Sequence, residues 1–304
     1  MEERVARMLN RLRAGAGACA CGAYLAGLDA LHRTEILTSL AYDRLARKFG
    51  TVRELHAEAG ENWNQTFYLL FFRTLGDRRN QSAYLELARR VPYATVLRER
   101  ASLQHVEAML FGASGLLDLY RHDEYTLGLR RDYEYLAAKY GIERMDAAAW
   151  NLVRLHPANH PVLRIASHEF VVDRVVECRT REEVERLFGT EASAYWCTHY
   201  LPGSPSGELP KRIGAFKANI LGINLVAIMQ YAYGSYLDNE ALRGRAIALL
   251  ERLDAEDNVY MRRWRAEGVP LRNAFESQAL LQLETEFCAA RRCAECPVGR
   301  RRLR

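Results

Sequence analysis

Three cysteines near the end of the chain are the residues best suited to chemistry. Cys288, Cys293 and Cys296 follow one another at C-x4-C-x2-C spacing in the stretch FCAARRCAECPVGRRRLR, residues 287–304. Two thiolates separated by two residues can bind one metal ion while the amides between them turn inward. Adding Cys288 produces the spacing found in plant-type iron–sulfur proteins. We therefore predict zinc or an iron–sulfur cluster at these three cysteines.

A four-ligand site needs one more side chain, because PVGRRRLR after Cys296 contains no ligand. The alternative is a set of three reduced thiols at a helix end, where the neighbouring arginines are favourably placed near the negative end of the helix dipole. The spacing alone does not decide between a metal site and reduced thiols. Candidates for a fourth ligand are Cys197, His199, Cys178 and the pair Cys19 and Cys21.

The same stretch carries all of the excess charge of the chain. From Cys288 onward there are six arginines and one acid, whereas residues 1–287 hold 37 basic and 37 acidic residues. Basic side chains that neutralise phosphates release counterions, so such a cluster predicts salt-sensitive binding. We expect contact with nucleic acid or an acidic protein partner through Arg291, Arg292, Arg300, Arg301 and Arg302.

A second polar group lies in WNLVRLHPANHPVLRIASHEF, residues 150–170. Its two prolines fix φ and favour a rigid loop that enters a helix. Arginine side chains and helix N-termini both bind anions, so Arg154, Asn159 and Arg164 could form a pocket for a phosphate or a carboxylate. The alternative, which we favour, is that the prolines shape a turn and the arginines bond buried carbonyls or acids.

Glu107, in LQHVEAMLFGASGLL, is predicted on the buried face of a helix. A buried carboxylate needs a partner, and Arg154 or Arg164 could supply it. A structural ion pair is therefore favoured over a general acid. The glycines of GASG are expected to allow close helix packing, because no strand precedes them as a dinucleotide-binding loop requires.

Helical periodicity dominates the elements that must position these groups. The segment 61–76 is apolar on most sides and is therefore predicted to be a buried helix. The segment VVDRVVE (171–177) is the one that a strand could claim. We predict an all-α fold, a multi-helix globular array without a substantial sheet. Other predicted helices are 28–50, 51–60 ending at Gly60, and 123–141 with Asp123 as N-cap and Gly141 at its end.

The strongest break in the chain is LPGSPSGELP (201–210), which holds three of the eight prolines. We expect it to join two helical layers of one helical domain that covers residues 1–287. The Cys- and Arg-rich tail, with its possible metal site, then covers residues 288–304.

The composition is that of an ordinary soluble globular protein, with 304 residues, 49% hydrophobic and 27% charged. No apolar run reaches the roughly 18 residues that a membrane helix needs. The N-terminal stretch has no apolar signal region. These features predict no membrane association. Seven cysteines without a framework spacing predict a reducing compartment, the cytoplasm.

Several blocks of the sequence carry a family resemblance. NWNQTFYLLFFRTLG, LQHVEAMLFGASGLL, WNLVRLHPANHPVLRIA, NAFESQALLQLETEFC and RRCAECPVG resemble, in this order, the C-terminal helical part of a bacterial family labelled domain of unknown function 2851. The resemblance covers roughly residues 35–300. It implies that relatives carry an upstream β-rich domain with nuclease-like motifs. This chain begins after that point, so a separate domain or subunit would have to supply it.

The chain departs from the family pattern at several positions. His156 and His160 stand where the family has Arg and Phe, and Asn64 and Gln65 stand where acids follow Trp63. Any function of those acids in relatives is in doubt here. The family has no established activity, so the resemblance implies a fold and not a reaction. The stretch CAECP also resembles the cluster loop of helix-hairpin-helix DNA glycosylases, which favours an iron–sulfur cluster over zinc.

Two functional hypotheses follow. The sequence contains no P-loop, nucleophile elbow or zinc-protease helix. This favours a non-catalytic helical binding module that contacts nucleic acid or an acidic partner through its C-terminus. The alternative is an enzyme or enzyme subunit that acts on a phosphorylated or nucleic-acid substrate bound at the predicted anion pocket.

Overall fold

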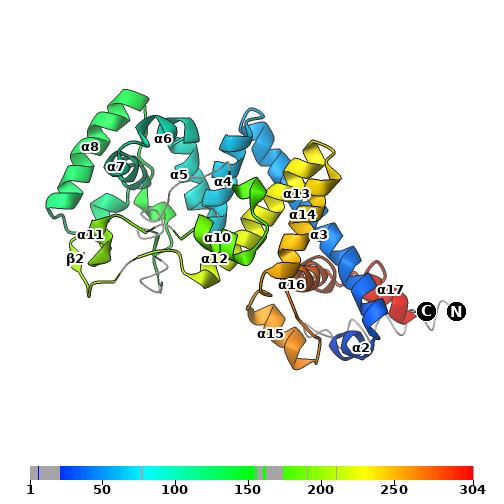
Figure 1. Cartoon of the computed structure of the whole chain (residues 1–304). Helices are drawn as coiled ribbons and strands as arrows, with labels where there is room; N and C mark the ends of the chain where they lie inside the picture. Colours follow the sequence, from blue (N-terminus) through cyan, green and yellow to red (C-terminus); the bar gives the residue numbers. More distant parts are fainter. Residues whose placement is uncertain are drawn as a thin grey trace. The chain divides into compact units, whose positions relative to one another are not determined.

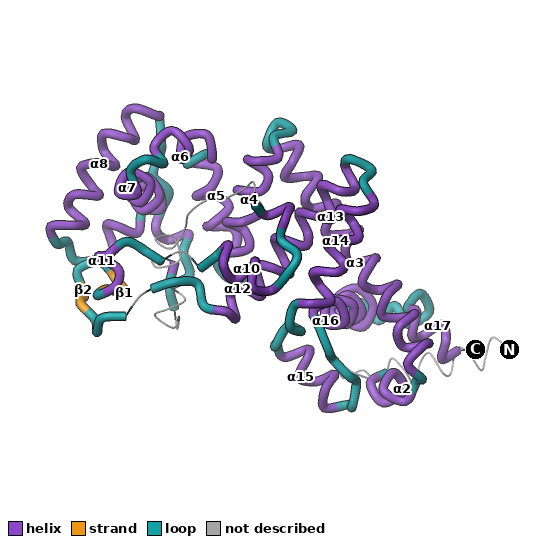
Figure 2. The backbone as a smooth tube through the Cα atoms, in the orientation of Figure 1, coloured by secondary structure: helices purple, strands orange, loops and turns teal. Residues whose placement is uncertain are grey.

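The fold is built almost entirely of helices (Figure 1). It is known from a computed structural model that describes Ala6 and residues 21–76, 78–153, 155, 160–161, 174–189, 191–209 and 211–303, with Leu303 described by its backbone alone. Within these residues the only sheet is a two-stranded antiparallel hairpin of β1 (His199–Leu201) and β2 (Ser204–Pro205) (Figure 2). The predicted all-α class is confirmed.

The chain forms two compact units. Unit 1 comprises Met1–Thr51, Arg179–Arg181 and Gln230–Arg304, and unit 2 comprises Val52–Cys178 and Glu182–Met229. The predicted break at 201–210 falls inside unit 2, and the predicted tail is part of unit 1. The division into a helical domain over 1–287 and a tail over 288–304 stays a prediction.

The helices of unit 2 surround an aromatic core. In α4, Tyr68 and Phe72 are fully buried, with ring centroids 4.8 Å apart. The predicted burial of this helix is therefore confirmed. The elements of unit 2 are α4 (Trp63–Leu75), α5 (Gln81–Arg90), α6 (Tyr93–Glu99), α7 (Leu103–Ser114), η1 (Leu116–Leu119), α8 (Glu124–Tyr140), η2 (Ala147–Ala149), η4 (Val175–Glu177), α10 (Arg181–Leu187, which begins in unit 1), α11 (Ala194–Cys197), α12 (Ala215–Leu221) and the π-helix η5 (Gly222–Val226).

Helices α7 and α8 approach closely because of a glycine. A methyl group on Gly112 would lie 2.0 Å from Cγ of Tyr133 on α8. Gly115 ends α7 in the left-handed region, at φ 73°, where glycine carries no Cβ penalty. The predicted packing role of the GASG glycines is confirmed. Asp123 caps α8 through a capping box and Gly141 ends it at φ 68°, also as predicted.

One long helix replaces two predicted ones. Helix α3 (Ala30–Glu58) runs without a break through Gly50, so the predicted separate helix over 51–60 is wrong. Val52 and Leu55 are buried and continue the apolar face past the glycine. One internal glycine costs a helix only about 1 kcal/mol relative to alanine, which this packing exceeds. The predicted end at Gly60 is confirmed by its φ of 62°.

The segment 171–177, which could have formed a strand, contains none in its described part, residues 174–177. Val175–Glu177 forms a short 3-10 turn. Residues 171–173 lie outside the described residues.

The helices of unit 1 come from both ends of the chain. Trp264 of α15 and Leu280 of α16 are fully buried in its core. Its elements are α2 (Gly22–Gly27), the first part of α3, α13 (Ala227–Tyr236, which begins in unit 2), α14 (Glu240–Arg252), α15 (Val259–Ala266), α16 (Ala274–Gln282), the π-helix η6 (Leu283–Cys288) and α17 (Pro297–Leu303).

A polar seam fixes α16 against α3 in unit 1. Arg44 is buried and donates to Gln278 at 2.5 Å, and Gln278 in turn donates to Glu256 at 2.9 Å. One turn further on, Arg47 donates to Gln282 at 3.3 Å. Such bonds have strict geometry, so they set the register of α16 and of η6, which continues it to Cys288.

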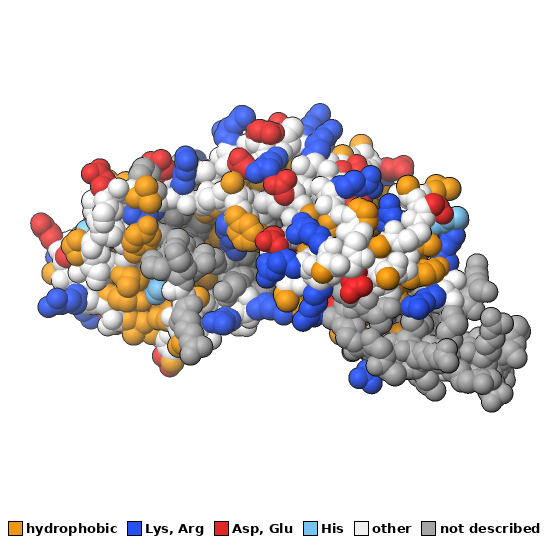
Figure 3. All heavy atoms as spheres, turned by 90° about the horizontal axis from the view of Figure 1, so that it is seen from below, with side chains coloured by type: hydrophobic (Ala, Val, Ile, Leu, Met, Phe, Trp, Pro, Cys, Tyr) orange, Lys and Arg blue, Asp and Glu red, His pale blue; other side chains and the backbone are white. Residues whose placement is uncertain are grey.

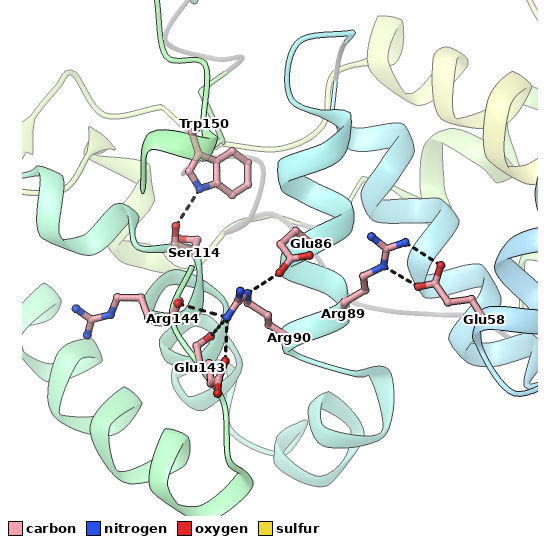
Figure 4. Close-up of polar contacts among 8 residues, drawn as sticks. All are labelled: Glu58, Glu86, Arg89, Arg90, Ser114, Glu143, Arg144 and Trp150. Atoms are coloured by element: carbon pink, nitrogen blue, oxygen red, sulfur yellow. Dashed lines mark hydrogen bonds and ion pairs between the residues drawn. The ribbon is translucent and has the colours of Figure 1, made fainter. Parts of the chain in front are cut away.

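Two ion pairs of α5 lie at the surface of unit 2, one to Glu58 of α3 and one within α5 (Figure 4). Arg89 donates two hydrogen bonds to Glu58 at 2.7 and 2.8 Å. Arg90 donates to Glu86 at 2.8 Å. All four side chains are partly exposed, so these pairs add little stability and carry no chemistry. No helix among the described residues is long and apolar enough to cross a membrane.

Candidate functional site

The three predicted cysteines lie on a helix end, a turn and a helix start. Cys288 is the last residue of η6, whose π-turn is closed by the Ala289 N–H donating to the Glu284 carbonyl at 2.9 Å. The chain then reverses at Arg291, which takes the left-handed conformation at φ 53°. Cys293 lies in the turn that follows, and Cys296 immediately precedes α17. π-turns of this kind are frequent at functional sites.

Cys21 joins these three cysteines. It begins α2 and is partly exposed, as are Cys288 and Cys293, while Cys296 is buried. Burial raises the pKa of the Cys21, Cys288 and Cys296 thiols, and the neighbouring thiols of the group raise it further. The pKa of Cys288 is raised by the other three thiols, that of Cys296 by Cys21 and Cys293, and that of Cys21 by Cys293. Every pair among the four therefore lies within electrostatic range. We call these four residues the thiol cluster.

Backbone and side-chain donors surround the thiol cluster. The N–H groups of Val298 and Gly299 hydrogen-bond to the Cys296 sulfur and favour its thiolate. Arg302 donates to the Cys21 sulfur at 3.9 Å from Nη1, and its guanidinium lies 5.7 Å from the Tyr24 ring centroid. These contacts hold α17 beside α2 (Figure 1). Hydrogen bonds to sulfur are a means by which proteins stabilise bound thiolates.

Glycine is required where α17 meets the turn. A Cβ on Gly299 would lie 1.9 Å from the carbonyl oxygen of Cys293. No side chain fits at that distance. The absence of one lets the start of α17 press against the backbone that carries Cys293.

The thiol cluster does not form a site for a single metal ion. Among the described residues, no group of three or more His, Cys, Asp or Glu side chains lies close enough to hold a metal ion. Ligands of one tetrahedral zinc lie about 2.3 Å from the metal, which puts its sulfurs within about 4 Å of one another. No three thiols of the cluster meet the requirements of such a site.

A buried acid that sequence reasoning missed adjoins the cluster. Glu284 is one turn before Cys288, is 5% exposed, and lies near enough to contribute to the raised pKa of that thiol. Its Oε2 has no hydrogen-bond partner among the described residues. Burial raises the pKa of Glu284, and Arg263 opposes this rise. The signal in the sequence was an acid four residues before a candidate ligand.

The five tail arginines divide into two kinds. Arg292 pairs with Glu295, Arg301 lies 3.5 Å from Glu35, and Arg302 faces the thiol cluster. Arg291 and Arg300 are exposed and make no ion pair within the described part of the chain. On the face drawn in Figure 3, basic and acidic side chains lie together in several places. This agrees with the equal numbers of basic and acidic residues in residues 1–287. Among the described arginines of the tail, Arg291 and Arg300 are therefore the exposed ones that no acid neutralises.

Two other fourth-ligand candidates, Cys178 and His199, have partners of their own in unit 2. Cys178 is buried and donates to the Arg174 carbonyl at 3.5 Å. His199 contacts the Thr198 hydroxyl and the Tyr195 carbonyl, each at 3.0 Å, and belongs to the β1 strand after Cys197. Cys19 lies outside the described residues.

Glu107 is the centre of a second polar cluster, in unit 2. It is 2% exposed and accepts hydrogen bonds from Ser193 at 3.0 Å, from Trp196 Nε1 at 3.2 Å and from the Tyr125 hydroxyl. Burial raises the pKa of this carboxyl, and the three donors oppose the rise. All its described partners are neutral. The predicted arginine partners Arg154 and Arg164 lie outside the described residues, so that prediction stays untested.

An aromatic stack covers this cluster. Tyr195 is sandwiched between Tyr125 and His199, with centroid distances of 4.1 Å on both sides. Its hydroxyl donates to the Asp123 carboxylate at 2.6 Å. Both faces of Tyr195 are thus occupied by protein, which leaves neither for a stacked base.

The predicted anion pocket cannot be placed, because Arg154, Asn159 and Arg164 lie outside the described residues. Of the histidines near it, His160 is buried and its Nε2 lies 2.8 Å from the Tyr120 hydroxyl. Burial lowers the pKa of His160 to about 4, so it is neutral at pH 7.

Comparison with known proteins gives one match. A family model described as "Protein of unknown function (DUF2851)" matches residues 1–259. The match includes Cys21 and Glu107 and ends before Cys288. It starts and ends earlier than the range 35–300 that the sequence blocks indicated. Neither a curated protein nor a solved structure matches the chain.

Proposed function

The chain belongs to the DUF2851 family of proteins of unknown function, and from that premise we propose that it is a non-catalytic helical module that binds the phosphate backbone of nucleic acid. The supporting observation is the pair Arg291 and Arg300. Both are exposed and free of ion pairs within the described residues, on a segment held in place by its packing on α2. Arginine presents a fork of donors that matches phosphate.

This segment exposes charged side chains and backbone rather than large apolar side chains. Val298 is fully buried, and the exposed positions of residues 289–300 are three alanines, Glu295 and three arginines. Tight protein interfaces rely on aromatic or apolar anchors that enter a pocket. Contact with phosphates needs only positive charge at the right places. We therefore favour nucleic acid over an acidic protein as the partner.

Two double variants with equal charge change test this proposal. R291A/R300A removes the unpaired arginines, whereas R292A/R301A removes two that face Glu295 and Glu35. Binding of a labelled DNA duplex is followed by fluorescence anisotropy over a salt series. Each lost phosphate contact lowers the slope of log K against log salt by about 1. We expect R291A/R300A to lower the slope by about 2 and R292A/R301A to lower it by less than 1.

Three outcomes contradict the proposal. The wild-type chain could fail to bind the duplex even at low salt. The two double variants could lose the same affinity and slope, which would indicate non-specific attraction. Polyglutamate could bind as tightly as the duplex with the same dependence on Arg291 and Arg300, which would identify an acidic protein as the partner.

A further inference from the structure

We propose that Cys21, Cys288, Cys293 and Cys296 hold an iron–sulfur cluster, with Cys21 as the fourth ligand. This inference goes beyond the binding of nucleic acid and does not depend on it. It assigns a partner to the three C-terminal cysteines from a segment far away in the sequence.

The first step is the number and origin of the ligands. Iron–sulfur clusters are commonly bound by four cysteine thiolates. The thiol cluster supplies four, from the start of α2, the end of η6, the turn after it and the residue before α17. Cys178, the other cysteine described as buried, belongs to unit 2 and bonds to a backbone carbonyl there. Four of the six described cysteines thus gather at one place.

The second step is the spacing of the sulfurs. Every pair of them lies within electrostatic range, yet no three of them form a site for one metal ion. In a four-iron cluster each thiolate binds a different iron, so the sulfurs lie further apart than around zinc. Four neighbouring thiols that form no site for a single ion are therefore assigned to this larger group.

The third step is the setting of the thiols. Metal binding requires thiolates, and thiolates in a partly buried place need donors. Val298 and Gly299 supply backbone N–H groups to Cys296, and Arg302 supplies a positive charge to Cys21. These donors are in place for a group of negative sulfurs. These bonds are stronger to a thiolate than to a neutral thiol.

The fourth step is the acid beside the site. Buried polar atoms in folded proteins nearly always have a partner, yet Oε2 of Glu284 has none among the described residues. It lies one turn from Cys288 and within electrostatic range of it. In its protonated form the Glu284 carboxyl would have an O–H to donate to a sulfur of the bound cluster.

The test uses the full chain with matched cysteine variants. The protein is purified without oxygen and reconstituted with iron and sulfide, and iron, acid-labile sulfide and visible absorption are measured per chain. The site variants C21S, C288S, C293S and C296S are compared with C178S and C197S, which alter cysteines of unit 2. The variant C19S separates the two neighbouring N-terminal cysteines. Circular dichroism confirms that each variant is folded.

We expect the wild type, C19S, C178S and C197S to bind iron and sulfide in equal amounts with a brown colour. Each of the four site variants should lose most of the sulfide and colour, at least five-fold. Zinc without sulfide in the wild type, or no metal at all, would overturn the proposal. A C21S variant that binds as much iron and sulfide as the wild type would also overturn it. So would a C19S variant that loses the cluster while C21S keeps it. R291A/R300A should retain the cluster, so failure of nucleic-acid binding and failure of the cluster are distinguishable.

Discussion

Two buried acids, one in each unit, show different ways in which a carboxyl can be accommodated. Glu107 and Glu284 both lie on helices, are 2% and 5% exposed, and have a pKa raised by burial. Glu107 accepts hydrogen bonds from three neutral donors. Oε2 of Glu284 accepts none from the described residues and lies within electrostatic range of Cys288. The two acids are similarly buried and differ in the hydrogen bonds that the described residues offer them.

The largest expected effect separates these two acids directly. E107L leaves the Tyr125, Ser193 and Trp196 donors without an acceptor, so we expect a loss of roughly 4 kcal/mol in the free energy of unfolding. E284L removes a group that has no donor for Oε2, so its effect should stay within about 1 kcal/mol. Urea unfolding of metal-free protein, followed by tryptophan fluorescence, measures both. Equal losses would remove the contrast between the two acids.

The second prediction compares glycines in the two units. In G112A the new methyl group would meet the Tyr133 ring of unit 2, and overpacking of this kind costs about 1–3 kcal/mol. In G244A, on α14 of unit 1, nothing lies within 4 Å of the new Cβ, so helix propensity should stabilise the protein by about 0.5–1 kcal/mol. Thermal unfolding checks both. A G112A variant as stable as wild type would show that α7 and α8 can separate without cost.

The third prediction concerns acid pH. His160 has a folded pKa of about 4, below its usual value of 6.5. The unfolded chain therefore binds more protons between these values, and stability is lost as pH falls from 6.5 towards 4. We expect this to remove about 2 kcal/mol at pH 4.5. In H160Q, which keeps a polar partner for Tyr120, the loss attributable to this group should disappear. Urea unfolding at pH 7 and pH 4.5 measures the difference, and an unchanged slope in H160Q would contradict it.

The smallest expected effect belongs to the surface. Arg89 and Glu58 form a two-bonded pair in unit 2, but their side chains are 45% and 37% exposed. Exposed pairs contribute about 0.5 kcal/mol, and salt screens them. A double-mutant cycle with R89A and E58A should give that coupling in low salt and nearly none in 1 M salt. A coupling that persists at high salt would show that the pair is less exposed to solvent than its side chains indicate.

Local signals in the sequence predicted local structure well. Asp123 and Gly141 delimit α8 because capping depends on neighbours within one turn. The burial of α4 follows from its apolar surface on most sides. The break predicted after Gly50 failed because packing of the next turn outweighs one glycine. Local patterns therefore give the elements and most of their ends.

The candidate site was predictable in part. The spacing of Cys288, Cys293 and Cys296 indicated a metal site, but no local pattern could select Cys21 among the candidates. That choice depends on packing between segments at opposite ends of the sequence. The neutral partners of Glu107 were missed for the same reason, because Ser193 and Trp196 come from a distant helix.

Unit 1 is built from segments that the ribosome synthesises far apart in time. Its helices come from the first 51 residues and from residue 230 onward, whereas unit 2 is nearly continuous between them. Cys21 and Cys288 are separated by about 270 residues, so at ribosomal rates Cys21 waits on the order of 10 to 50 s for its partners. Unit 2 can fold during that time. Helix α2 and the first half of α3 are the first described helices of the nascent chain to be made, and among the last to find their neighbours.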